Sequence, residues 1–406
     1  MFCSPEFADL VNHDGIAHRF CTGDVDGFEP FAGLRVGPTE PPSPRLSGGI
    51  MNYTSGTTGK PKGVKRPLPP CPPEPVTTGY ASFLLMFGMQ PGVGVQLVGS
   101  PLYHTAVLYF STSALHLGHT VVLMKKWTPL GMLERIERYR VTASHMVPTQ
   151  FSRMLALPNH RDFDVSSVRH MVHGAAPCPN SVKEAMLEWW GDTVYEYYAA
   201  TEGGGTMVTP QEWRARPGTV GKAWQTAEIA IFDDEGQRLG PDQVGTVYIK
   251  MQQSFEYYRD KEKTQKSYNT DGYFTVGDAG YLDDQGYLFL CDRKADMIIS
   301  GGVNIYPAEI ESVMTTHPNI LDVAVFGIPD ADWGEQVRAV VELQDAAQDD
   351  AESIKAWCVE RIAKFKCPKT VQVIEAMPRD LNGKLRKRTL RDPFWEAHKA
   401  ATGRSI

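Results

Sequence analysis

A run of hydroxyl residues, glycines and lysines occupies residues 53–64, which read Tyr-Thr-Ser-Gly-Thr-Thr-Gly-Lys-Pro-Lys-Gly-Val. Gly56 and Gly59 allow the backbone to approach a ligand closely, and successive free N–H groups form a concave site for an anion. Lys60 adds positive charge beside these groups. The pattern predicts a loop that wraps a polyphosphate, and its hydroxyl donors are Thr54, Ser55, Thr57 and Thr58.

Two other interpretations of this run are weaker. A Walker A loop needs four residues between its glycines and Ser or Thr after its lysine. Here two residues separate Gly56 from Gly59, and Pro61 follows Lys60. A flexible linker often has the same composition, but linkers rarely follow an apolar, strand-like run such as residues 49–53.

Further side chains able to bind or activate a substrate occur in short segments along the chain. Small residues follow His173, a Thr-Glu pair stands at 201–202, and a Gly-Asp pair stands at 277–278. Singly, each has an ordinary structural explanation. An isolated histidine such as His104 is more often structural, small residues and a turn aspartate suit tight turns, and Lys384 suits an exposed loop.

Taken together, these segments resemble the motifs of the adenylate-forming superfamily, which contains acyl-CoA synthetases, luciferases and the adenylation domains of peptide synthetases. Residues 53–64 are similar to the family's phosphate-binding loop, and residues 198–202 are similar to its Tyr-Gly-x-Thr-Glu motif. Motifs in the family's order are far more specific than any one of them. The other segments that carry the resemblance are 101–104, 173–177, 277–278, 292–293, 300–307 and 378–384.

The resemblance implies a nucleotide site. It implies that Tyr198 stacks on adenine, that Thr201 binds phosphate and that Glu202 holds Mg²⁺ through an oxygen ligand. It also implies that Asp278 binds the ribose hydroxyls and that Arg293 is directed at ribose or phosphate. The segment that lines the adenine and acyl pockets would contain Gly174, Ala175 and Ala176.

The resemblance further implies sites for an acid and for coenzyme A. His104 would be a gate to the acyl tunnel, and Gly203 and Gly204 would leave room for a bulky acyl group. Gly301 and Gly302 would line the path of the pantetheine arm. Lys384 would be the catalytic lysine that bridges the substrate carboxylate and the α-phosphate of ATP.

Three positions depart from the family's pattern. Ala199 replaces the usual glycine of the Tyr-Gly-x-Thr-Glu motif, and Val276 stands where a threonine usually precedes Gly-Asp. The hinge before the C-terminal domain, often Asp or Lys, aligns with Ala295, and Lys294 stands beside it. These departures leave the identity of the hinge residue open between Lys294 and Ala295.

Composition excludes several other classes of protein. The 406 residues carry a net charge of −7, which argues against a nucleic-acid partner. Seven cysteines without Cys-x-x-Cys spacing disfavour a disulfide framework or a structural zinc site. Without a signal peptide or an apolar stretch long enough to span a bilayer, a cytoplasmic location is expected. Oligomeric state is not predicted.

The pattern of elements predicts an α/β fold in two domains. Helix-like and strand-like segments alternate over residues 130–200, which predicts α/β layers with a mostly parallel sheet. Residues 227–291 predict a β-rich subdomain, and the residues after Arg293 predict a small α+β lid domain. Residues 67–75 are predicted to form a proline-rich surface loop. The expected boundaries are 1–292 for the adenylation domain, 293–295 for the hinge, 296–390 for the C-terminal domain and 391–406 for a tail.

The expected function is an acid–CoA ligase that uses ATP, Mg²⁺ and coenzyme A. The acid is expected to be a long-chain fatty or bulky, steroid-type acid. A peptide-synthetase module is disfavoured, because residues 103–108 lack the Asp that binds a substrate amine. Only 52 residues precede the phosphate loop, fewer than in typical relatives. A truncated, non-catalytic or partly active adenylate-binding homologue is therefore the alternative.

Overall fold

The computed structural model describes residues 1–11, 15–37, 39–41, 43–54, 62–344, 348–380 and 383–402. The chain divides into two compact units, Met1–Gly48 with Pro69–Pro73 and Gly49–Leu68 with Glu74–Ile406. The first unit contains a parallel sheet of two-residue strands, in the order β1-β2-β3. Its elements are β1 (Phe2–Cys3), α1 (Ala8–Val11), β2 (Phe20–Cys21), β3 (Glu29–Pro30) and the 3₁₀ turns Pro5–Phe7 and Phe31–Val36.

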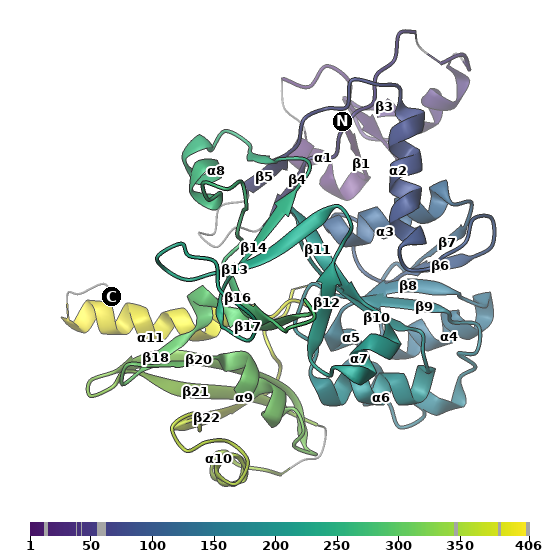
Figure 1. Cartoon of the computed structure of the whole chain (residues 1–406). Coiled ribbons are helices and arrows are strands. Elements are labelled where there is room, and N and C mark those ends of the chain that lie inside the picture. Colours follow the sequence, from purple (N-terminus) through teal and green to yellow (C-terminus); the bar gives the residue numbers. More distant parts are fainter. Residues whose placement is uncertain are drawn as a thin grey trace. The chain divides into compact units, whose positions relative to one another are not determined.

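An eleven-stranded mixed sheet forms the framework of the second unit, in the order β13-β14-β16-β17-β12-β11-β10-β9-β8-β6-β7 (Figure 1). One part is parallel and consists of β6 (Val95–Val98), β7 (Thr120–Leu123), β8 (Ala143–Met146), β9 (His170–His173) and β10 (Val194–Ala200). The antiparallel part consists of β11 (Gly203–Val208), β12 (Thr219–Ala223), β13 (Ala227–Phe232), β14 (Gly245–Met251), β16 (Asp278–Leu282) and β17 (Leu288–Arg293).

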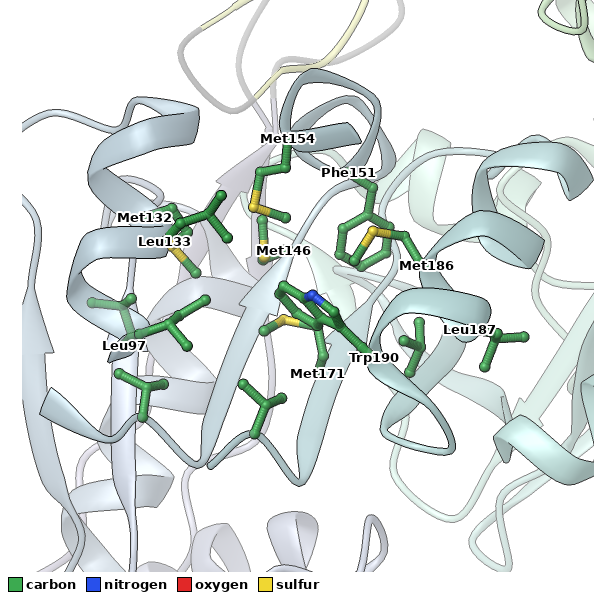
Figure 2. Packing of buried hydrophobic residues seen from close by; sticks show 14 of the residues in the cluster. Leu97, Met132, Leu133, Met146, Phe151, Met154, Met171, Met186, Leu187 and Trp190 are labelled. Atoms are coloured by element: carbon green, nitrogen blue, oxygen red, sulfur yellow. The ribbon is translucent and has the colours of Figure 1, made fainter. Parts of the chain in front are cut away.

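Helices cover both faces of the parallel part. Successive residues of a strand point to opposite faces, and Met171 and Val172 of β9 accordingly belong to different buried clusters. The cluster of Met171 packs against α4, α5 and α6, and Figure 2 shows Met146, Phe151 and Trp190 within it. The helices are α2 (Pro73–Leu85), α3 (Thr105–His116), α4 (Pro129–Tyr139), α5 (Pro148–Leu155), α6 (Asn180–Trp190) and α7 (Pro210–Ala215).

Local sequence explains where α4 begins and ends. The Thr128 side chain accepts a hydrogen bond from the Gly131 N–H, and Pro129 occupies the first helical turn, where no N–H partner is needed. The helix ends at Arg140, whose φ of 51° takes the chain into the left-handed region. Between these ends, the buried Met132, Leu133 and Ile136 recur at helical spacing.

A smaller sheet joins residues on both sides of the predicted phosphate loop. It contains β4 (Asn52–Thr54), β5 (Lys62–Lys65) and β15 (Glu256–Tyr257) in the order β15-β5-β4, and α8 (Lys261–Ser267) follows β15. The strands β4 and β5 are antiparallel, with Thr54 opposite Lys62. The loop between them therefore leaves and re-enters this sheet at neighbouring points.

The residues after Arg293 form a sheet of their own, covered by helices (Figure 1). Its strand order is β19-β18-β21-β20, and β22 pairs with β21. Alternate residues of β20 face different cores, since Val325 belongs to one cluster while Ala324 and Phe326 belong to another. The elements are β18 (Ile298–Ser300), β19 (Val303–Ile305), α9 (Pro307–Met314), β20 (Ile320–Asp330), β21 (Gly334–Leu343), α10 (Ala351–Val359), β22 (Thr370–Ile374) and α11 (Lys387–Thr402), with a 3₁₀ turn at Lys294–Asp296. Another 3₁₀ turn, His160–Asp162, stands between α5 and β9 of the large sheet's layers.

The predicted fold class is confirmed, with α/β layers, a β-rich part and a small α+β C-terminal part. The loop prediction for residues 67–75 is wrong at its end, because α2 begins at Pro73. Proline is tolerated in the first turn of a helix, where the N–H groups have no helical partner. The helix α11 runs across residue 390, so the predicted tail continues an element of the C-terminal part. Within the described ranges, no helix is long and apolar enough to cross a membrane.

Candidate active site

The carboxyl ends of the parallel strands bring several predicted site residues to one edge of the large sheet. His104 follows β6, Gly174 follows β9, and Thr201 follows β10, while Thr149, which was not predicted, follows β8. Parallel strands end on the same side of a sheet, and ligands of open α/β sheets bind there. The sequence motifs are thereby assembled from segments that are up to about a hundred residues apart.

Tyr198, Asp278 and Arg293 form a connected cluster. The Tyr198 hydroxyl donates to Asp278 Oδ2 at 2.7 Å, and Arg293 Nε lies 3.4 Å from Asp278 Oδ1. Asp278 and Arg293 face each other across the antiparallel strands β16 and β17. Burial, together with the neighbouring Asp278 carboxylate, raises the pKa of Tyr198 well above its ordinary value, so the phenol stays protonated. The structure brings these three residues together, and their contacts with adenine and ribose stay a prediction.

Lys384 lies within the electrostatic reach of this cluster, although its side chain keeps exposed surface. Surrounding protein atoms lower the pKa of Lys384, and the nearby Arg293 cation lowers it further. Burial also lowers the pKa of His104, with opposing effects from Asp380 and Lys384. His104 Nε2 is buried and has no hydrogen-bond partner among the described residues. The C-terminal lysine thus interacts electrostatically with the Asp278–Arg293 pair and with His104 of the predicted acyl gate.

The segment that carries Lys384 is held by hydrogen bonds from both parts of the second unit. The Gly383 carbonyl accepts a hydrogen bond from Arg379 Nη1 at 2.6 Å and from Thr149 Oγ1 at 3.3 Å. Arg379 itself makes two 2.6 Å bonds to the Asp322 carboxylate. A Cβ atom at Gly383 would lie 3.1 Å from Val147 Cγ2, which shows how closely the segment approaches α5.

Thr201 and Glu202 form the turn between β10 and β11. The Tyr257 hydroxyl donates to Glu202 Oε1 at 2.6 Å, and Thr201 Oγ1 lies 3.4 Å from Thr105 Oγ1. In the part of the chain that is described, no hydrogen bond reaches Glu202 Oε2, and no group of three His, Cys, Asp or Glu could hold a metal alone. Mg²⁺ commonly takes one or two carboxylates plus substrate phosphates, and a single carboxylate with a free oxygen fits that mode.

The residues after β9 approach their neighbours closely. A Cβ at Gly174 would lie 2.7 Å from the Tyr197 carbonyl oxygen, so only glycine fits there. Ala175 has a φ of 68°, which is uncommon for a residue with a side chain. Such strain persists where surrounding structure holds the backbone, and it is concentrated at functional sites. The predicted adenine-side role of Gly174, Ala175 and Ala176 stays a prediction.

The argument that Gly203 and Gly204 leave room for an acyl group gains no support here, because protein atoms occupy the space where a Cβ atom of either residue would lie. A Cβ at Gly203 would lie 2.6 Å from Met251 Sδ, and one at Gly204 would lie 2.3 Å from Ile249 Cγ2. Their missing side chains let the turn after Glu202 pack against β14. Contact between these glycines and an acyl group is left as a prediction without that argument.

Two predicted residues of the C-terminal part lie in a separate turn. Gly301 and Gly302 form the turn of the β18–β19 hairpin, and a Cβ at Gly301 would lie 2.5 Å from the Trp333 ring. Within the described ranges, no hydrogen bond or ion pair joins them to the Tyr198 cluster. Thr54 ends β4, and the remaining phosphate-loop residues Ser55, Gly56, Thr57, Thr58, Gly59 and Lys60 lie outside the described residues.

The structure adds site residues that sequence reasoning missed. Arg66 donates from Nη2 to the Thr201 carbonyl at 2.7 Å. With it belong Thr105, Thr149 and Tyr257, whose contacts are described above. Two of these residues could have been found from the sequence. Arg66 follows the strand after the phosphate loop, and Thr149 follows a predicted strand. Nothing local to Tyr257 indicates its contact with Glu202, which is 55 residues away.

Two family models match parts of this chain. A family model described as AMP-binding enzyme matches residues 26–259, and one described as AMP-binding enzyme C-terminal domain matches residues 309–384. A long-chain-fatty-acid–CoA ligase of Bacillus subtilis is 31% identical over 355 residues, which cover 86% of this chain and 62% of that protein. An indoleacetate–CoA ligase of Aromatoleum aromaticum is 33% identical over 385 residues, which cover 94% of this chain and 71% of that protein.

A solved structure is also similar. It is the o-succinylbenzoate CoA synthetase of Bacillus subtilis in complex with its acyl-adenylate intermediate, with a TM-score of 0.72 and 32% sequence identity. The match covers 84% of this chain and 68% of that one. This chain therefore spans 62–71% of the length of these three relatives, whose acids differ from one another.

Proposed function

Because this chain belongs to the AMP-binding enzymes of the adenylate-forming superfamily, we propose that it is an acid–CoA ligase. A carboxylate oxygen attacks the α-phosphorus of ATP, the bond to the β-phosphate breaks, and pyrophosphate leaves. The thiolate of coenzyme A then attacks the acyl carbon, the bond to the adenylate oxygen breaks, and AMP leaves. The observation that carries the proposal is the hydrogen bond from Thr149 at the start of α5 to the Gly383 carbonyl, which joins the Lys384 segment to the edge where the motif segments meet. Lys384 also interacts electrostatically with Asp278, Arg293 and His104.

In the first step, negative charge gathers on phosphate oxygens, and fixed cations stabilise it more than acid–base groups do. Lys384 is the cation that bridges the acid's carboxylate and the α-phosphate. Tyr198 holds the adenine ring, while Asp278 and Arg293 hold the ribose. Mg²⁺ bound by Glu202 and the phosphates would neutralise charge on the leaving pyrophosphate.

In the second step, the C-terminal domain rotates about the hinge at residues 293–295. This rotation withdraws Lys384 and brings Gly301 and Gly302 to the pantetheine arm. Support comes from the hydrogen bond that joins the Lys384 segment to Thr149, whereas Gly301 lies against the Trp333 ring. We propose that this arrangement is the adenylate-forming state.

The acid we propose is a long-chain fatty acid or a bulky, steroid-type acid. Support comes from aromatic side chains of α2 and of α3, the helix that begins at Thr105. The Tyr109 ring contacts Tyr80 and Phe83 at centroid distances of 5.1 and 4.9 Å, and Phe83 contacts Trp224 at 5.9 Å. Burial raises the pKa of Tyr109 to about 12, so this surface carries no phenolate charge. A large apolar acid gains more than acetate from such contacts.

The test is acid-dependent AMP release by the purified 406-residue chain with ATP, Mg²⁺ and coenzyme A. A panel of short, long, aromatic and steroid carboxylic acids identifies the class, and chelation of Mg²⁺ by EDTA is expected to stop release. Activity with long-chain or steroid acids supports the full proposal. Activity confined to another group of acids contradicts the proposed acid and still supports the ligase reaction. If a folded protein binds ATP but releases no AMP with any acid, a non-catalytic adenylate-binding homologue is favoured.

A substitution at Thr149 tests whether the Gly383 contact places Lys384. Thr149→Val removes one hydrogen bond to the lysine segment, which is worth about 1 kcal/mol, or roughly fivefold in rate. We expect slower acyl-adenylate formation and an unchanged rate of thioester formation from pre-made adenylate. Thr149→Ser keeps the hydroxyl and serves as the matched control. Equal losses in both half-reactions would contradict the role of this contact.

A further inference from the structure

Arg66 lies where no motif of the sequence predicted a cation. It follows the strand β5, and its Nη2 donates to the Thr201 carbonyl at 2.7 Å. The groups that interact with it electrostatically are the Glu202 carboxylate and the phenols Tyr80, Tyr109 and Tyr268. Arg66 therefore stands between the predicted phosphate side of the site, at Thr201 and Glu202, and the aromatic surface of α2 and α3.

The hydrogen-bonding capacity of Arg66 is largely unused. A guanidinium has five N–H donors, and the contact with Thr201 uses one of them. Among the described residues, no carboxylate lies within ion-pair distance of Arg66. Glu202, the acidic group that acts on it, is already bonded to the Tyr257 hydroxyl. Withdrawing a cation from water without an anionic partner is costly, so an anion from outside the chain would compensate it.

The neighbouring Lys65 shows the ordinary alternative. Lys65 is exposed, and its Nζ lies 2.9 Å from Glu256 Oε1 on the paired strand. Arg66 instead is partly buried, and its Nη2 lies so close to the backbone that a Cβ at Gly203 would approach it to 3.4 Å. Lys65 and Arg66 thus have different environments. Lys65 forms an ion pair, whereas Arg66 has no carboxylate within ion-pair distance among the described residues.

We propose that Arg66 is a further substrate-binding residue, whose free N–H groups bind an oxyanion of the reacting pair. A guanidinium binds the two oxygens of a carboxylate or a phosphate side by side, so the acid's carboxylate and the phosphates of ATP share the chemistry it recognises. This inference rests on the proposed function for its choice of ligands. It adds a cation that the family motifs did not assign.

The experiment measures binding by calorimetry to the full chain and to three variants, Arg66→Met, Arg66→Lys and Lys65→Met. The probes are ATP with Mg²⁺, inorganic pyrophosphate with Mg²⁺, and octanoate as a soluble fatty acid. Arg66→Met is expected to weaken at least one probe by about tenfold or more, because it removes a charge-assisted hydrogen-bonding group. Arg66→Lys keeps the positive charge and should lose less affinity for the probes. Lys65→Met should bind all probes with the affinity of the unmodified chain.

The probes separate the two sources of the oxyanion. Weaker binding of ATP and pyrophosphate identifies the phosphates, and weaker binding of octanoate alone identifies the carboxylate. Unchanged binding of all probes by a folded Arg66→Met variant overturns the proposal and leaves Arg66 as an anchor for the Thr201 carbonyl. If Arg66→Met does not fold, Arg66→Gln replaces it under the same criterion. ATP binding without AMP release would overturn the ligase function and still allow this test.

Discussion

Replacing Lys384 with alanine is expected to abolish acyl-adenylate formation and to spare thioester formation from pre-made adenylate. The Lys384 ammonium interacts electrostatically with Asp278 and Arg293, and we propose that it stabilises the negative charge that gathers on the phosphate oxygens in the first step. Loss of one preorganised charge-stabilising group costs on the order of 10²–10³-fold in rate. In the proposed cycle, the second step does not use this cation, because the domain rotation withdraws it first.

The two half-reactions are measured separately, by acid-dependent ATP–pyrophosphate exchange and by acyl-CoA formation from synthetic acyl-adenylate. The control is Lys399→Ala, which removes an exposed lysine near the end of α11. This control should leave both rates within twofold. If Lys384→Ala lowers both half-reactions equally, the lysine acts in both states and the proposed domain rotation is wrong.

The second large effect is expected on stability, at a buried ion pair that no motif contains. Lys183 of α6 has no exposed surface, and its Nζ lies 2.5 Å from Glu196 Oε2 of β10, which is also buried. Lys183→Met leaves that carboxylate without its cation. Removing one partner of a buried pair costs about 3–5 kcal/mol of unfolding free energy.

The pH dependence of this variant follows from Glu196. Burial raises the pKa of Glu196, and the Lys183 ammonium opposes that rise. His173 and Cys178 also face the carboxylate, and burial keeps both neutral by lowering the pKa of His173 and raising the pKa of Cys178. Without Lys183, the folded-state pKa of Glu196 lies above its unfolded value of about 4.3. The contribution of Glu196 to the free energy of unfolding is then fully present below the unfolded-state pKa, and it is lost as pH rises through the folded-state pKa.

Urea unfolding of Lys183→Met between pH 4 and pH 8 checks both expectations, and the deficit should grow toward neutral pH. The matched control is the double variant Lys183→Met/Glu196→Met, which replaces the pair with apolar side chains of similar size. Most of the lost stability should return in it, because no lone charge remains buried. Exposed Lys126→Met should change stability by less than about 0.5 kcal/mol. A double variant as unstable as the single one would contradict the ion-pair explanation.

Much of the fold could be predicted from local patterns. The predicted alternation over residues 130–200 and the β-rich character of residues 227–291 are confirmed, for example by the helix Asn180–Trp190 and the strand Ala227–Phe232, because periodicity and flanking turn residues are local signals. The start of α2 at Pro73 was missed, because a proline that breaks a helix interior is compatible with its first turn. Lys183 was not expected inside, since its partner lies 13 residues away on another element.

The sequence by itself determined the family, the order of the motifs and the residue types of the candidate site. Those properties depend on residue identity and spacing along the chain, which the sequence states directly. Only the tertiary structure decided which of these residues meet. It joins the Lys384 segment to Thr149 of α5, packs the glycines after Glu202 against β14, and directs Arg66 to a carbonyl 135 residues away. Such contacts depend on how strands pair and helices pack across the whole unit, and no local pattern encodes the direction of a side chain between distant segments.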